Sequence, residues 1–172
     1  FWYASIISKK NSAKEALSGI DVQLKKRSNL IPNILSIARK FMDHEKTLLT
    51  EVTELRSKTD SEYDKGDPES VKQHLQQAGA LGESMGKLMI SVEAYPDLKS
   101  DETMIQAQKS YGEVEAQIAA ARRFYNSSVT SLNNSIEIFP GNLIAGLANA
   151  TPMPFYETDE ISRNPVSADD IL

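Results

Sequence analysis

The chain has 172 residues, the length of one ordinary domain, and 40% of them are hydrophobic, which is enough to build a core. Lysine and arginine total 19 against 24 acidic residues, giving a net charge of −5. We expect no nucleic-acid partner, because such a partner needs clustered cations. The chain has no cysteine, which excludes a disulfide framework, a thiolate zinc site and a thiol nucleophile.

Residues 1–10 are typical of the end of a membrane-spanning helix. Aromatic and apolar residues open the chain, and three lysines follow by position 14. This order is common where a spanning helix meets the headgroup layer, and the lysines favour the cytoplasmic side. A periplasmic domain is the alternative. The segment can also be interpreted as an apolar N-terminal turn that packs on its own bundle.

The stretch from Leu17 to Leu55 is predicted to be one long amphipathic helix. Apolar residues recur at the a and d positions of a heptad, as in a coiled coil. A third apolar stripe gives the wider face of a helix in a globular bundle. Pro32 falls within this register and removes one backbone hydrogen bond, so the helix should kink or split there. Because the apolar period continues past it, we favour a kink.

A second helix is predicted from Pro68 to Tyr95, after a polar connection. Asp67 suits the N-cap of this helix and Pro68 its first position. Pro96 disfavours the helical conformation for the residue before it, so the helix should end by Tyr95.

A third helix is predicted from Asp101 to Phe139, where a Pro-Gly pair stops it. Residues 142–148 add a short C-terminal helix. Short connections between long amphipathic helices make antiparallel neighbours. The sequence therefore predicts an all-α, up-and-down antiparallel bundle of three long helices, or four if the first one splits near Pro32.

The domain organisation follows from these helices. Residues 1–10 are a juxtamembrane segment, residues 11–148 form the helical bundle, and residues 149–172 form an extended, acidic tail that contains prolines. The tail has no helical period. We expect Phe155 and Tyr156 to lay it back along the bundle.

Several charged residues fall on the apolar seam of the helices. Burying an ion without a partner costs several kcal/mol, so these side chains should pair across helices. With the first and third helices parallel, Glu45 lies level with Arg122, and we predict an ion pair between them. Such a network can set the register of the helices. The alternative is a functional site at the same place. The candidate network is Arg27, Glu45, Glu115 and Arg122.

The second helix and the turn after it carry a candidate partner surface. Gly79, Gly82 and Gly86 lie inside the helix, where each glycine costs about 1 kcal/mol relative to alanine. They indicate the close approach of another helix, from the bundle or from a partner. The turn is either a docking surface or a simple connection, and counting residues places it at the membrane-proximal end. Its residues are Tyr95, Pro96, Asp97 and Leu98.

Metal and catalytic sites are not evident in the sequence. A di-iron bundle needs glutamate three residues before histidine, but Phe41 and Val71 hold those positions relative to His44 and His74. A Gly-rich phosphate loop is missing. We therefore predict no metal, no cofactor and no enzymatic activity.

Three phrases of the sequence, residues 20–35, 93–99 and 121–147, resemble the LemA family of bacterial membrane-anchored helical proteins. The resemblance covers most of the chain. It implies a single-pass anchor in the bacterial cell membrane just ahead of Phe1, and it assigns no catalytic residue.

We expect a non-enzymatic adaptor or scaffold whose partner is an unidentified membrane protein or another copy of the chain. One alternative is a ligand sensor or enzyme that uses Glu45, Glu115 and Arg122. Another is remodelling of the lipid surface by the amphipathic N-terminal stretch. A ligand-sized cavity at the charged seam would favour the sensor, and a fully paired core would favour the adaptor.

Overall fold

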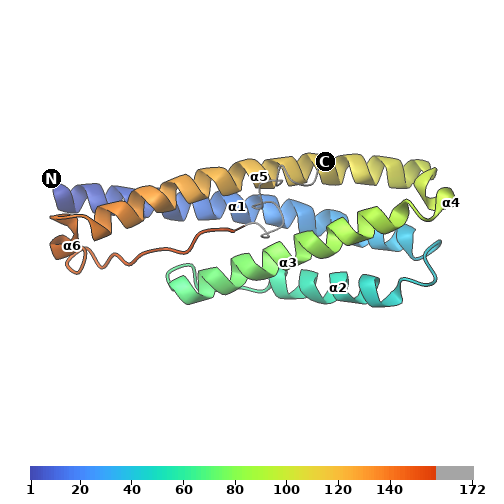
Figure 1. Cartoon of the computed structure of the whole chain (residues 1–172), viewed down its shortest axis with the longest axis horizontal. Helices are drawn as coiled ribbons and strands as arrows, with labels where there is room; N and C mark the ends of the chain where they lie inside the picture. Colours follow the sequence, from blue (N-terminus) through green and yellow to red (C-terminus); the bar gives the residue numbers. More distant parts are fainter. Residues whose placement is uncertain (158–172) are drawn as a thin grey trace, which may run out of the picture.

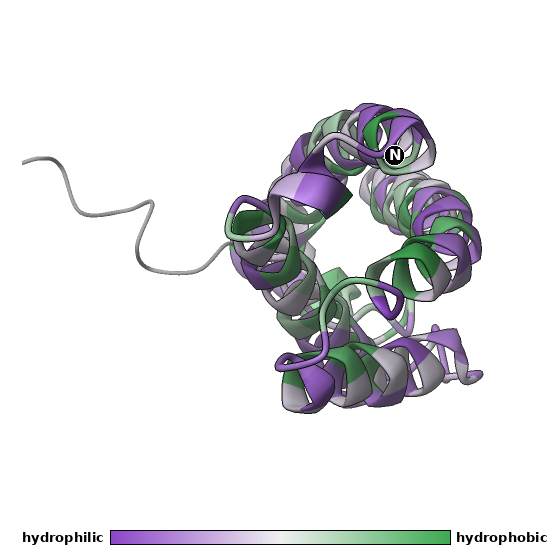
Figure 2. Cartoon of the chain, turned by 90° about the vertical axis from the view of Figure 1, so that its right-hand side faces the viewer, coloured by the Kyte–Doolittle hydropathy of each residue, from purple (hydrophilic) through white to green (hydrophobic). Residues whose placement is uncertain are grey.

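The computed structural model describes residues 1–157, and within them the chain is all-α, as predicted. The chain reverses direction between successive long helices, so α1 and α3 run one way and α2 and α5 the other (Figure 1). Seen end on, the helices surround a common axis (Figure 2). The helices are α1 (Trp2–Ala38), α2 (Lys46–Asp60), α3 (Pro68–Val92), α4 (Pro96–Lys99), α5 (Glu102–Glu137) and α6 (Gly141–Ile144).

The first predicted helix is divided into α1 and α2. α1 continues through Pro32, and the break lies further on, at residues 39–45. The apolar period did not reveal this break because Met42, within the connection, is itself buried in the core. The additional reversal makes α1 and α5 antiparallel, whereas the sequence predicted parallel first and third helices.

Pro32 is accommodated by a contact from another helix. Proline has no N–H to donate to the carbonyl of Ser28, four residues earlier. Instead, Nε of Arg56 on α2 donates to the Ser28 oxygen at 2.9 Å. The hydrogen bond that is missing within α1 is thus replaced by one between α1 and α2.

The limits of the other long helices follow the sequence signals. The side chain of Asp67 accepts hydrogen bonds from backbone N–H groups in the first turn of α3, as an N-cap does. α3 ends at Val92, and Pro96 begins the short helix α4. Asp101 caps α5 in the same way as Asp67 caps α3.

The buried apolar side chains form three clusters along the bundle. The largest lies at the end that carries α4, and large side chains such as Met85, Leu88 and Leu98 fill it. A second cluster occupies the middle. The third lies toward the N-terminus, where only α1, α5 and residues 144–153 contribute, and four of its seven buried members are alanines.

Residues 149–156, which we call the strap, run back along α5 in the opposite direction. Two asparagines of α5 hold it, each through both atoms of its side-chain amide. Asn126 donates to the carbonyl of Tyr156 at 3.0 Å and accepts from its N–H at 2.8 Å. Asn133 donates to the carbonyl of Met153 at 3.0 Å and accepts from its N–H at 2.9 Å.

The two contacts are about the same distance apart on α5 and on the strap, although a helix and an extended chain rise by different amounts per residue. The asparagines are seven residues apart on a helix, or about 10.5 Å. Their partners are three residues apart on an extended chain, or about 10 Å. Tyr156 is buried, as expected of a tail laid along the bundle, but Phe155 is 45% exposed and contributes less than predicted. Residues 158–172, the rest of the predicted tail, lie outside the described residues.

Candidate functional site

Arg27 is the centre of the buried charges. Its side chain is only 2% exposed. Nη1 donates to Oε1 of Glu115 on α5 at 3.2 Å, and Nη2 donates to the carbonyl of Ala78 on α3 at 2.8 Å. A Cβ at Gly82 would lie 3.1 Å from Nη1, so this glycine makes room for the guanidinium. Arg27 therefore joins α1 to both α3 and α5.

The predicted pair of Glu45 and Arg122 is not formed. Glu45 directly precedes α2, at the end of the bundle where α5 begins. Arg122 lies twenty residues into α5, which amounts to about 30 Å along that helix. Its guanidinium instead lies 5.8 Å from the ring centre of Tyr156 in the strap. The error follows from the reversal at residues 39–45.

A second cluster surrounds Asp21, and sequence reasoning missed it. Tyr63 donates its hydroxyl hydrogen to Asp21 Oδ2 at 2.7 Å, and Nζ of Lys65 lies 3.1 Å from the same oxygen. Nε2 of His74, on α3, lies 3.1 Å from Oδ1. The rings of Tyr63 and His74 stack at a centroid distance of 3.8 Å and an angle of 10°. Asp21 thus joins α1 to α3 and to the loop before it.

The partners of Asp21 decide its ionisation. Burial alone would raise the pKa of Asp21, but the hydrogen bonds from His74, Tyr63 and Lys65 outweigh burial and lower it below its ordinary value. Burial, and then the hydrogen bond to Asp21, raise the pKa of Tyr63. The site therefore holds a carboxylate and a neutral phenol at neutral pH. Among residues 1–157, no group of three or more histidine or acidic side chains is placed to hold a metal.

One signal in the sequence could have pointed to this cluster. His74 shares a helical face with Val71 and Ala78, both fully buried, so its ring faces the core. Tyr63 is the one aromatic residue in a polar connection, which indicates packing against a helix. What could not be read was that both residues meet Asp21.

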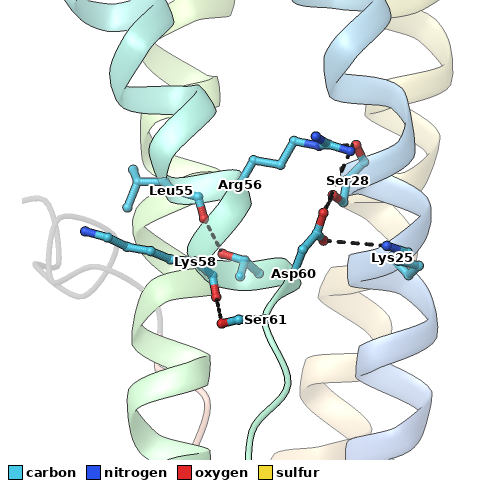
Figure 3. A network of polar contacts seen from close by, with 8 residues as sticks. Lys25, Ser28, Leu55, Arg56, Lys58, Asp60 and Ser61 are labelled. Carbon is cyan, nitrogen blue, oxygen red and sulfur yellow. Dashed lines mark hydrogen bonds and ion pairs between the residues drawn. The ribbon is translucent and has the colours of Figure 1, made fainter.

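A third network joins α1 to α2 (Figure 3). Arg56 reaches across to the carbonyl of Ser28, and the Ser28 hydroxyl donates to Asp60 Oδ2 at 2.7 Å. Asp60 also lies 3.9 Å from Nζ of Lys25. Between this network and the Asp21 cluster is an open cavity of about 370 Å³, whose lining includes Asp21, Lys25, Asp60, Tyr63, Lys65 and His74.

The predicted partner surface is divided by the structure. Gly79 and Gly86 have open space where a Cβ would stand, whereas Gly82 faces Arg27. In the turn, Pro96 and Asp97 are exposed, Tyr95 is half-buried, and Leu98 is fully buried. The turn lies at the opposite end of the bundle from Phe1 (Figure 1), and not at the N-terminal end where counting residues placed it.

Across the described stretch 1–157, no helix has both the length and the apolar character that crossing a bilayer requires. The longest helices, α1 and α5, each present one polar face to solvent.

Known proteins resemble this chain over most of its length. It is 22% identical to the magnetosome proteins MamQ 1 and MamQ 2 of Paramagnetospirillum magneticum and to the magnetosome protein MamQ of Magnetospirillum gryphiswaldense. Each similarity covers 95% of this chain and 68% of the relative. The model of the LemA family matches residues 16–169. Because that match spans nearly the whole bundle, the chain belongs to the LemA family.

Proposed function

We propose that this protein is a membrane-associated, non-enzymatic scaffold that presents one face of its bundle to another membrane protein. Family membership supports the membrane association, and LemA is not a known enzyme family. The three lysines near the N-terminus support a cytoplasmic bundle.

The observation that carries the scaffold proposal is the set of polar contacts that join the middle of α1 to the other helices. Within two turns of α1, Asp21, Arg27 and Ser28 contact α3, α5 and α2 respectively. Directed polar contacts of this kind, here partly buried, hold helices in a single register. A bundle held in this way can present a surface of constant shape.

The surface that we propose for the partner is the outward face of α3 near α4. Gly79, Gly86 and Ile90 lie on one face of the helix, at intervals of seven and four residues. Ile90 is 74% exposed, and the two glycines leave the backbone open to close approach. Pro96 and Asp97, which are also exposed, follow at the α4 end of this helix. A partner helix would fit here better than a loop, because small residues let two helix backbones approach.

The test is photo-crosslinking of the full-length protein in its own cells. A crosslinking residue replaces Ile90, and the matched control replaces Gln117, which is exposed on α5. We expect one membrane protein to be captured from position 90 and not from position 117. The substitution Gly86→Trp should prevent that capture, and it should not disturb the fold because nothing occupies the space. Equal capture from both positions would refute the proposed surface, and capture of another copy would identify the partner as the chain itself.

A ligand sensor is the second candidate function. Its binding site would be the cavity beside Asp21, and not the site at Glu45, Glu115 and Arg122 that the sequence suggested. The cavity brings Lys25 and Lys65 together with Asp21 and Asp60, so it suits a small molecule that carries both charges. We expect free amino acids, used as probes, to shift the NMR signals of His74 and Tyr63 in the wild type. The Asp21→Asn variant should lose those shifts. Unchanged signals throughout the series would exclude this candidate.

A further inference from the structure

The exposed large hydrophobic side chains are concentrated at one end of the molecule. Of twelve such residues within the described chain, seven lie in residues 1–3 and 138–147. They include Leu143 and Leu147, which are 70% and 80% exposed. The full set at this end is Phe1, Trp2, Tyr3, Ile138, Phe139, Leu143 and Leu147.

Two separate parts of the chain form this end. One is the first turn of α1. The other is the α5–α6 corner, residues 138–147, which follows α5 and includes α6 (Figure 1). Ile6, Ile136 and Ala145 belong to one buried cluster, so the two parts pack on each other. The corner is therefore fixed beside the N-terminal turn, and its outer side chains point away from the core.

The charges at this end differ in sign from those of the whole chain. Residues 1–14 and 138–156 contain none of the 24 acidic residues, and the nearest ones, Glu15 and Glu137, are exposed at their borders, whereas the net charge of the whole chain is −5. The same two segments carry three lysines, Lys9, Lys10 and Lys14. The end is thus apolar at its tip, and the three lysines outnumber the two glutamates beside it.

We propose that the α5–α6 corner is a lipid-binding surface that enters the headgroup and upper acyl region of an anionic bilayer beside the N-terminal turn. Aliphatic side chains with tryptophan and tyrosine, flanked by lysine, have the composition of a protein surface at that depth. Anionic lipid attracts lysines near the surface. This inference rests on the proposed membrane association.

The chain provides a clean experiment because it has no cysteine. Leu143→Cys, labelled with an environment-sensitive fluorophore, reports on the corner, and Ile90→Cys on α3 is the matched control, being equally exposed. The 172-residue chain is mixed with phosphatidylcholine vesicles that contain either no phosphatidylglycerol or about 30 mol% of it. Trp2, the only tryptophan, reports on the N-terminal turn in the same samples.

We expect a blue shift at position 143 with the anionic vesicles, and none at position 90. The double substitution Leu143→Ser and Leu147→Ser should weaken vesicle binding at least about tenfold. Helix content should not change, because both leucines are exposed.

Three results would overturn the inference: no shift at position 143, an equal shift with uncharged vesicles, or a shift caused by dimerisation without lipid. Partner capture from position 90 in cells is independent of these results. If the corner does not bind lipid and capture still succeeds, the scaffold proposal stands and only the lipid-binding surface is lost.

Discussion

The two halves of the bundle are closed in different ways. In the half that carries α4, residues of five helices meet in a core of large aliphatic side chains. Toward the N-terminus, α2 and α3 contribute nothing to the buried cluster, and the strap and α6 cover α1 and α5 there. Alanines dominate the core there because an extended chain must lie close to the helices. Stability is therefore expected to come from buried volume in one half and from directed hydrogen bonds in the other.

The largest expected effect compares two leucines, one in each half. Leu98→Ala removes a fully buried side chain and should lower the free energy of unfolding by about 2–5 kcal/mol. Leu143→Ala removes an exposed one and should change it by less than about 0.5 kcal/mol. Urea unfolding followed by circular dichroism measures both. Similar losses in the two variants would mean that the corner is closed by contacts absent from this structure.

The next effect concerns the hydrogen bonds that hold the strap. Asn133→Ala leaves the N–H and carbonyl of Met153 without their partner, which should cost about 1–3 kcal/mol if they stay buried. We expect the strap to open locally instead, so amide exchange at Met153 and Tyr156 should accelerate more than global unfolding. Asn134→Ala, one residue further along on the exposed face, is the control. Unchanged exchange in the Asn133 variant would show that packing alone holds the strap.

A smaller effect is expected from the hydrogen bond between Arg56 and the Ser28 carbonyl, beside Pro32 in the half that carries α4. Arg56→Met removes the donor to the Ser28 carbonyl and should cost about 1 kcal/mol. In a Pro32→Ala background, the restored backbone N–H supplies that carbonyl, so the same change should cost less. A double-mutant cycle should therefore give a coupling free energy of about 0.5–1.5 kcal/mol. A coupling near zero would contradict the idea that Arg56 compensates for proline.

The smallest effect is a pH dependence near the boundary between the halves. The folded-state pKa of Asp21 is lowered from its ordinary value of 3.8, so its stabilisation is present above that value and is lost as pH falls through the folded pKa. The free energy of unfolding should therefore fall on acidification below about pH 4. Asp21→Asn should flatten that part of the profile. Parallel profiles for the two proteins would assign the acid sensitivity to other carboxylates.

The sequence was informative where a local signal decides the structure. Asp67, Pro68 and Pro96 set the limits of α3, and the burial of Arg27 followed from its place on the apolar seam. The reversal after Ala38 could not be seen, because the connecting residues keep the apolar period.

That one missed reversal also determined the errors at the candidate site. Which charges meet depends on how many times the chain turns, so the partner of Arg27 is Glu115, and Arg122 does not reach Glu45. The Asp21 cluster was missed for a related reason: Tyr63 and Lys65 lie in a loop, and periodicity does not place loop residues. Local rules thus recovered the limits of α3 and the start of α5, whereas the break between α1 and α2 and the long-range pairs required the fold.

The two asparagines of α5 recognise the strap by its main chain. Their four hydrogen bonds all go to backbone atoms of Met153 and Tyr156, so these bonds do not depend on the side chains at the two positions, although the Tyr156 ring is itself buried. The bonds do depend on the number of residues between Met153 and Tyr156, because the two asparagines are a fixed distance apart on α5. An insertion or deletion of a single residue between the two contacts would put the second pair of bonds out of register with its asparagine, so these bonds constrain the length of the strap.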